Sequence, residues 1–62
     1  MEPIKISGLE PYSSIYLSTI GGYVWMNIMV KHGSANLQLD EKAVEQLIEA
    51  LHKTVSEAES GG

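Results

Sequence analysis

Adjacent glycines at positions 21 and 22 separate two runs of strand-forming residues. A two-residue turn of type I′ needs positive φ at both central positions, which glycine adopts without steric cost. The pair therefore predicts a tight β-hairpin in which Ile20 lies opposite Tyr23. The register of this hairpin follows from the turn, because residues that face each other across two strands share one side of the sheet.

Further turn signals divide the rest of the chain before residue 40 into strands. His32-Gly33 predicts a second tight hairpin. Residues 8–13 form a longer connection, since Pro11 has no amide hydrogen to donate to a sheet ladder. The expected strands are residues 3–8, 13–20, 23–31 and 34–39.

The two turns place apolar side chains on the same side of the predicted sheet, which we call the inner face. The glycine pair gives one register, and the His32-Gly33 turn independently pairs Leu37 with Ile28. The same turn pairs Leu39 with Met26. The first strand adds two isoleucines if it pairs with the second strand. The inner face then comprises Ile4, Ile6, Ile15, Leu17, Thr19, Val24, Met26, Ile28, Val30, Leu37 and Leu39.

A helix is predicted for the last third of the chain. From Glu41 to about Glu59 there is neither glycine nor proline, and the apolar residues recur with a helical period. Asp40 is a suitable N-cap, because its carboxylate can accept hydrogen bonds from free amides of the first turn. The apolar stripe, which should cover the inner face, consists of Val44, Leu47, Ile48, Leu51 and Val55.

The expected fold is an α+β domain: a four-stranded antiparallel meander sheet followed by one C-terminal helix packed on one face (ββββα). Residues 1–59 should form this single domain and residues 60–62 a disordered tail. A chain of 62 residues has little stability to spare when it folds alone. Because it has no cysteine for a disulfide, we expect a homodimer.

The opposite side of the sheet, the outer face, also carries large side chains, and the chain has no second helix to cover it. Along the second to fourth strands it has no formally charged residue before Lys31. Tyrosine, tryptophan and methionine are enriched at protein interfaces. The candidate binding or dimer residues on this face are Tyr16, Ile20, Tyr23, Trp25, Asn27, Met29 and Gln38.

Three uses of the outer face remain open from the sequence. It can be a homodimer interface with a purely structural role, or a binding surface for another protein. It can also stack nucleic-acid bases on Tyr16, Tyr23 and Trp25. Nucleic acid is disfavoured as a partner, because the chain has four lysines, no arginine and a net charge of −4.

No catalytic, cofactor or metal site is expected. His32 lies in a predicted turn and His52 on the helix, and no partner is spaced to make either one a general base. With two histidines and no cysteine, a structural zinc site is not expected either. We therefore expect a protein without enzymatic activity.

The location expected from the sequence is the cytoplasm, without a membrane partner. The absence of cysteine is compatible with a reducing compartment. Glu2, Lys5 and Glu10 interrupt the apolar residues near the start, so neither a signal peptide nor a membrane-spanning segment is expected.

Residues 23–55 resemble the single-stranded-DNA-binding transcriptional coactivators and the related Whirly proteins in the arrangement of their elements. The run YVWMNIMV is similar to a long third strand, and NLQLDEKAVEQLIEAL to a last strand that leads into an acid-capped helix. The resemblance implies a dimer paired through its helices, with sheets presented to DNA. The chain departs from that family because it lacks basic residues on the sheet, so no functional residue is carried over.

The function expected from the sequence is that of a small binding or regulatory protein that acts through protein–protein contacts as a homodimer. Small stand-alone domains of this kind are often accessory proteins of the phage type. The alternative is a single-stranded nucleic-acid-binding protein that uses the aromatic outer face.

Overall fold

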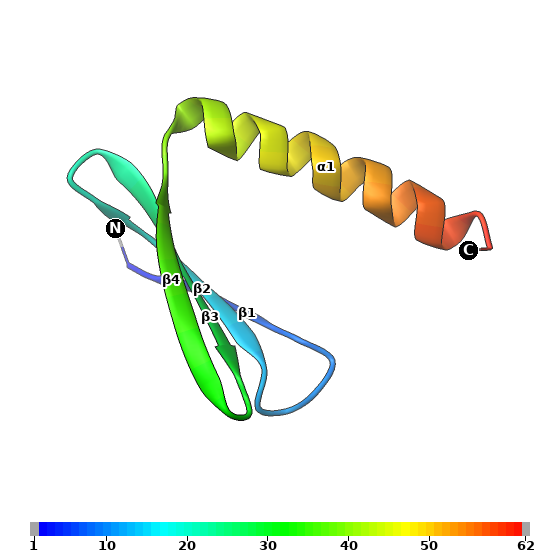
Figure 1. The fold of residues 1–62 in the computed structure, drawn as a ribbon, viewed down its shortest axis with the longest axis horizontal. Helices are drawn as coiled ribbons and strands as arrows, with labels where there is room; N and C mark the ends of the chain where they lie inside the picture. Colours follow the sequence, from blue (N-terminus) through cyan, green and yellow to red (C-terminus); the bar gives the residue numbers. More distant parts are fainter. Residues whose placement is uncertain (1, 62) are drawn as a thin grey trace.

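The computed structural model describes residues 2–61 and has four antiparallel strands in one sheet followed by one helix, which confirms the predicted ββββα fold (Figure 1). The predicted domain and tail also include Met1 and Gly62, which lie outside the described residues. Each strand pairs with the next one in sequence, in the order β1-β2-β3-β4. The elements are β1 (Ile4–Ser7), β2 (Ser14–Ile20), β3 (Tyr23–Val30), β4 (Gly33–Leu39) and α1 (Glu41–Glu59).

The turn between β2 and β3 has the predicted geometry. Gly21 and Gly22 have φ angles of 56° and 86°, so both lie in the left-handed region that a type I′ turn requires. Ile20 lies opposite Tyr23, as the turn predicts, and the rest of the β2–β3 ladder continues from that pair.

The turn between β3 and β4 lies one residue earlier than predicted. Lys31 and His32 form it, and Val30 lies opposite Gly33. The prediction placed Gly33 inside the turn because glycine adopts positive φ readily, but Gly33 does not have positive φ here. It is instead the first residue of β4.

This change moves the β3–β4 register by two residues and corrects two predicted pairs. Leu37 lies opposite Met26, not Ile28, and Leu39 lies opposite Val24. Because side chains alternate with a period of two, a shift of two residues leaves each of them on the predicted face. The assignment of both leucines to the inner face is therefore confirmed although their partners were wrong.

The connection between β1 and β2 is closed by a short hydrogen-bonded loop. The Gly8 amide donates to the Ser13 carbonyl at 2.9 Å, and the Ser13 amide donates to the Glu10 carbonyl at 3.1 Å. Pro11 occupies the second position of that tight turn, where its fixed φ is suitable. A side chain on Gly8 would collide with Ser13 Oγ, so the close approach explains the glycine.

Asp40 caps the N-terminus of α1, as predicted. It has extended backbone angles (φ −85°, ψ 176°), and its Oδ1 accepts a hydrogen bond of 2.8 Å from the Ala43 amide. Its carbonyl accepts the first helical hydrogen bond from the Val44 amide at 3.0 Å. The helix bounds also agree with the prediction.

The C-terminus of α1 ends at a capping residue. The Ser60 amide donates to the Ser56 and Glu57 carbonyls, at 3.1 Å and 3.2 Å. Gly61 follows with a φ of 91°, in the region that glycine favours after a helix.

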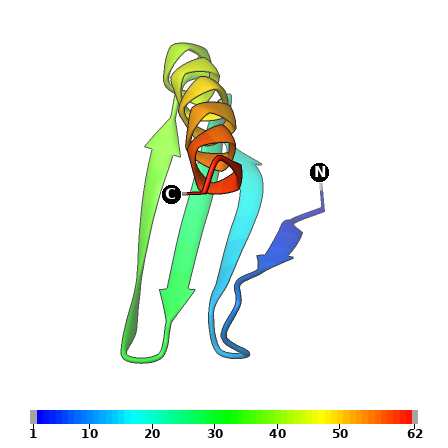
Figure 2. The same ribbon diagram turned by 90° about the vertical axis from the view of Figure 1, so that its right-hand side faces the viewer.

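α1 lies over the inner face but does not lie flat on it. It begins at one end of the sheet and diverges from the strands along its length (Figure 1). Seen nearly along its axis, it lies above the middle of the sheet, with β1 off to one side (Figure 2). Its contacts with the sheet are made mainly with β3 and β4.

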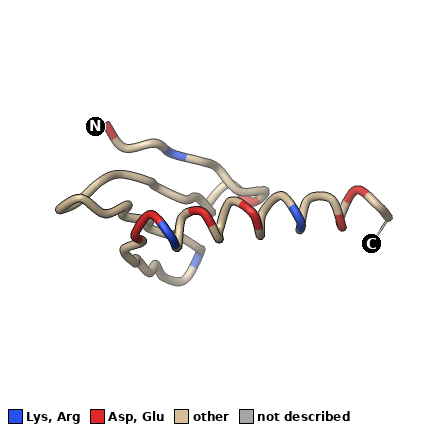
Figure 3. Tube along the Cα trace, turned by 90° about the horizontal axis from the view of Figure 1, so that it is seen from above, with Lys and Arg blue, Asp and Glu red and all other residues tan. Residues whose placement is uncertain are grey.

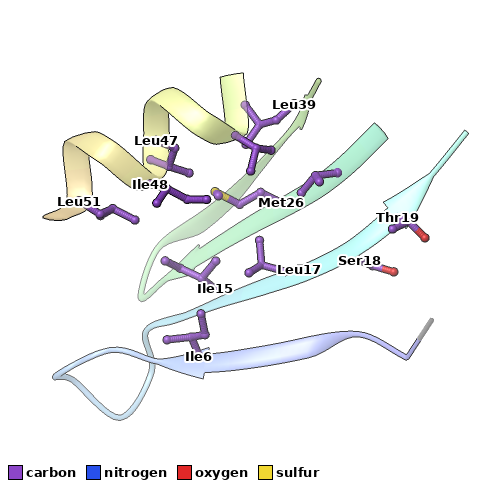
Figure 4. A pocket seen from close by; sticks show the side chains of 12 residues that line it. Ile6, Ile15, Leu17, Ser18, Thr19, Met26, Leu39, Leu47, Ile48 and Leu51 are labelled. Atoms are coloured by element: carbon purple, nitrogen blue, oxygen red, sulfur yellow. The ribbon is translucent and has the colours of Figure 1, made fainter. Parts of the chain in front are cut away.

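The space between α1 and the sheet is an open apolar groove of about 400 Å³. Leu47, Ile48 and Leu51 line one wall and point towards the strands (Figure 4). Ile6 of β1 and Ile15 of β2 line the opposite wall. The stripe of the helix therefore faces the inner face, as predicted, but closes only part of it.

One copy of the chain buries little of its apolar surface. Among the described residues no hydrophobic side chain is buried, and Ser14 is the single buried polar residue. The radius of gyration is 13.2 Å, against about 10.6 Å for a compact domain of this length. The inner face and the helix stripe are thus only partly withdrawn from water.

Candidate functional site

The outer face is the side of the sheet that points away from α1, because successive side chains of a strand alternate between faces. The observed register arranges most of its residues in three rows across the strands, counted from the Gly21-Gly22 turn. These rows are Ile20 and Tyr23; then Ser18, Trp25 and Gln38; then Lys5, Tyr16, Asn27 and Asn36.

Trp25 occupies the middle of the outer face. It lies on the internal strand β3, between Ser18 of β2 and Gln38 of β4. Its side chain is half-buried, so part of it remains in contact with solvent. Gln38 adds an exposed amide beside the indole, and an amide can both donate and accept hydrogen bonds.

The next row joins an aromatic ring to polar groups. Tyr16 lies opposite Asn27, and Asn27 lies opposite Asn36. The Asn27 Nδ2 donates a hydrogen bond of 3.2 Å to the Ala35 carbonyl, which holds the amide against β4. The row therefore presents one hydrogen-bonded amide, that of Asn27, next to an aromatic ring.

The structure adds Lys5 to the outer face, a residue that sequence reasoning did not place there. Lys5 lies opposite Tyr16 in the β1–β2 pair, and its Nζ is 5.9 Å from the centre of the Tyr16 ring. At this distance a cation is attracted to the face of the ring. The signal was present in the alternation of β1, because Ile4 and Ile6 face inwards and the residue between them must face outwards.

Large apolar side chains at the two ends of the outer face are the most accessible. Tyr23 is 51% exposed and Ile20 is 49% exposed at one end. Met29 lies towards the other end, between Ser14 and Ser34, and is also exposed. The structure therefore brings all seven predicted contact residues onto one continuous face with Lys5.

Negative charge is concentrated away from this face. Six of the eight acidic residues lie between Asp40 and Glu59, along α1 (Figure 3). On the outer face of the described strands, β2, β3 and β4 carry no charged side chain. The face is thus suited to a partner recognised by apolar contact and neutral hydrogen bonds.

Side chains that could bind a metal ion do not cluster in the described part of the chain. Within residues 2–61, no three histidine, aspartate or glutamate side chains come together in the way that metal ligands do. The two histidines lie in different elements. His32 is exposed in the β3–β4 turn, and His52 is exposed on α1. α1, the helix of the described chain, is not apolar enough to cross a membrane.

The fold and the outer face define a class of molecule: a small ββββα domain with an aromatic surface on an uncovered sheet, where Lys5 of β1 is the charged residue among the described strands. No protein-family model matches the chain, and no curated protein or solved structure is significantly similar to it.

Proposed function

We propose that the protein is a non-catalytic binding protein that acts through protein–protein contacts and works as a homodimer. The observation that carries this proposal is the outer face, where Tyr23, Trp25 and Met29 follow one another along β3 of an uncovered sheet without charged neighbours on β2–β4. Aromatic rings supply large contact areas at a low cost in side-chain entropy, and they dominate many interfaces.

The polar groups of this face determine what kind of protein surface fits it. Gln38 and Asn36 present amides, and Ser18 presents a hydroxyl, all within the strands that carry the aromatic rings. These groups pair with backbone amides and carbonyls as well as with neutral side chains. A partner with an apolar patch bordered by neutral polar groups can cover the rings and pair with the amides and the hydroxyl. The charges of a strongly charged partner would find no opposite charge on β2–β4.

A protein of this kind regulates by occupying a surface of its partner. The domain has 62 residues, so a single contact face is a large share of its surface, and binding blocks whatever the partner does at that place. The cytoplasm is the proposed location, since a chain without cysteine needs no oxidising compartment to fold.

A second candidate function is the binding of single-stranded nucleic acid. The observation that favours it is the position of Lys5 beside Tyr16, because a cation next to a stacking ring is a common feature of such sites. The net charge of −4 opposes it, since phosphate contacts supply most of the affinity for nucleic acid. Protein–protein contact is therefore the better-supported function.

The decisive experiment compares how well outer-face variants and a control variant of equal exposure capture the partner. Tyr23 on the outer face and Tyr12 in the β1–β2 loop are almost equally exposed, at 51% and 50%. We expect Tyr23→Ala and Trp25→Ala to lose at least tenfold in affinity for a partner captured from the native cell. Tyr12→Ala should bind like the wild type.

The same variants separate the two candidate functions. Titration with an oligothymidylate, followed by the emission of the single tryptophan Trp25, tests nucleic-acid binding. Strong quenching that weakens steeply with added salt would favour the nucleic-acid function. Full capture of the protein partner by Tyr23→Ala and Trp25→Ala would contradict the proposed contact face.

A further inference from the structure

The inner groove is a second uncovered surface, and nothing in the proposed contact face uses it. On the sheet side, the exposed large apolar residues of the inner face are Ile4, Ile6, Ile28, Val30 and Leu37. On the helix side, Ile48, Leu51 and Val55 are each at least half exposed. Leu51 and Val55 belong to the C-terminal half of α1, which diverges from the strands (Figure 1).

The exposed area of one copy shows how much surface is left to cover. The structure exposes 5189 Å², whereas a compact monomer of 6.8 kDa exposes about 4,000 Å². The excess is therefore about 1,200 Å² for each copy. Two copies that removed this excess from water would bury about 2,400 Å² in total, within the range of obligate homodimers.

The groove needs an occupant that a single chain cannot provide. Each copy has eleven inner-face residues to cover and one helix stripe, and the helix lies mainly over β3 and β4. The uncovered inner surface thus lies on the β1–β2 side of the groove. It also includes the end of the sheet that is far from Leu39, where α1 has diverged from the strands. The free stripe is at the C-terminal half of α1.

These two uncovered surfaces complement each other across a two-fold axis. In an interface with two-fold symmetry, a contact made by one copy is repeated by the other. The free helix stripe of one copy can therefore pack on the free sheet surface of the other, and the same contact occurs a second time with the copies exchanged. The acidic residues Glu45 and Glu49 lie off the apolar stripe of α1, so the helix can keep its charges in water while its stripe is buried.

We propose that a second copy of this chain closes the inner groove. The C-terminal half of α1 in each copy packs on the uncovered inner face of the other copy's sheet. This inference rests on the homodimer of the proposed function and assigns its interface. It leaves both outer faces directed away from the groove and free to bind a separate partner.

Matched charge substitutions test the interface by the mass of the protein in solution. Val55 on the helix stripe is 54% exposed, and Ile20 on the outer face is 49% exposed. Sedimentation equilibrium should show a dimer for the wild type and for Ile20→Glu. Val55→Glu should weaken the dimer by at least tenfold, with circular dichroism reporting whether the variant is folded.

Chemical cross-linking keeps the test valid if Val55→Glu fails to fold. The chain has no cysteine, so each introduced thiol is unique. A mixture of Val55→Cys and Ile28→Cys proteins should give a mixed dimer with a short bismaleimide, because these positions meet between copies. Val55→Cys mixed with the outer-face control Ile20→Cys should give none.

The possible results distinguish this interface from the homodimer itself. A stable wild-type monomer at micromolar concentration would overturn both the homodimer and its interface. A dimer that resists Val55→Glu but dissociates with Ile20→Glu would overturn the inner-groove interface alone. Cross-linking of Val55→Cys to Ile20→Cys, without cross-linking to Ile28→Cys, would overturn it as well. Capture of a partner by the outer face is measured separately, through Tyr23→Ala.

Discussion

Val24 of β3 lies opposite Leu39 of β4, and this pair forms the end of the β3–β4 ladder nearest the helix. Both side chains line the inner groove. Asp40 follows Leu39 directly and caps α1, so the helix leaves the sheet at the point where the inner face ends. This relationship places the helix stripe over the inner face and leaves the groove open at the other end.

The cap at Asp40 should contribute measurably to stability. Asp40→Ala removes the hydrogen bond from the Ala43 amide and should lower the free energy of unfolding by about 1 kcal/mol. Asp40→Asn is the matched control, because asparagine caps helices about as well as aspartate. Urea denaturation measures both variants, and an equal loss in the two would contradict the capping role.

Two glycines in neighbouring hairpins should respond differently to alanine. Gly22→Ala forces a side chain into the left-handed region at φ 86° and should cost about 1–2 kcal/mol. Gly33 does not have positive φ and has open space around it. Gly33→Ala should therefore change the free energy of unfolding by less than about 0.5 kcal/mol. Thermal denaturation of the two variants checks this contrast.

Thermal stability should depend on protein concentration. If a second copy covers the inner groove, unfolding is coupled to dissociation, and a tenfold higher concentration stabilises the dimer by about 1.4 kcal/mol. Differential scanning calorimetry at low and high micromolar concentrations should show a clear rise in Tm. A Tm that stays constant over a hundredfold range would show that one copy folds alone.

Trp25 should remain accessible in the dimer. It lies on the outer face, away from the inner groove, so acrylamide should quench its emission equally in dilute and concentrated protein. A tryptophan placed at Leu51 in a Trp25→Phe background serves as the comparison. Its emission should be protected at high concentration only, and protection of Trp25 in its place would assign the interface to the outer face.

Much of the fold followed from local patterns in the sequence. The bounds of α1 and its cap at Asp40 were predicted because a 3.6-residue period and a capping side chain act within a few residues. Both faces of the sheet were predicted because the Gly21-Gly22 turn fixed the parity of the strands. The β3–β4 pairing was wrong by two residues, because Gly33 does not use the backbone freedom that the prediction assumed.

How much of the inner face α1 covers was not predictable from the same patterns. A helical period shows which side of α1 is apolar, but it says nothing about the angle between the helix and the strands. The exposure of Leu51 and Val55 depends on that angle, and so does the open groove. Lys5 was missed for a different reason, because only the apolar residues of β1 were followed across the sheet.

The direct join between β4 and α1 makes chain length at this point critical. Asp40 is the single residue between the two elements, so the count of residues sets the rotation of the helix about its own axis. One residue deleted here turns everything after it by about 100° and directs Glu45 and Glu49 at the groove. Insertions in the β1–β2 loop leave that rotation unchanged. The spacing at residue 40 therefore constrains the packing of the helix in a way that the length of the β1–β2 loop does not.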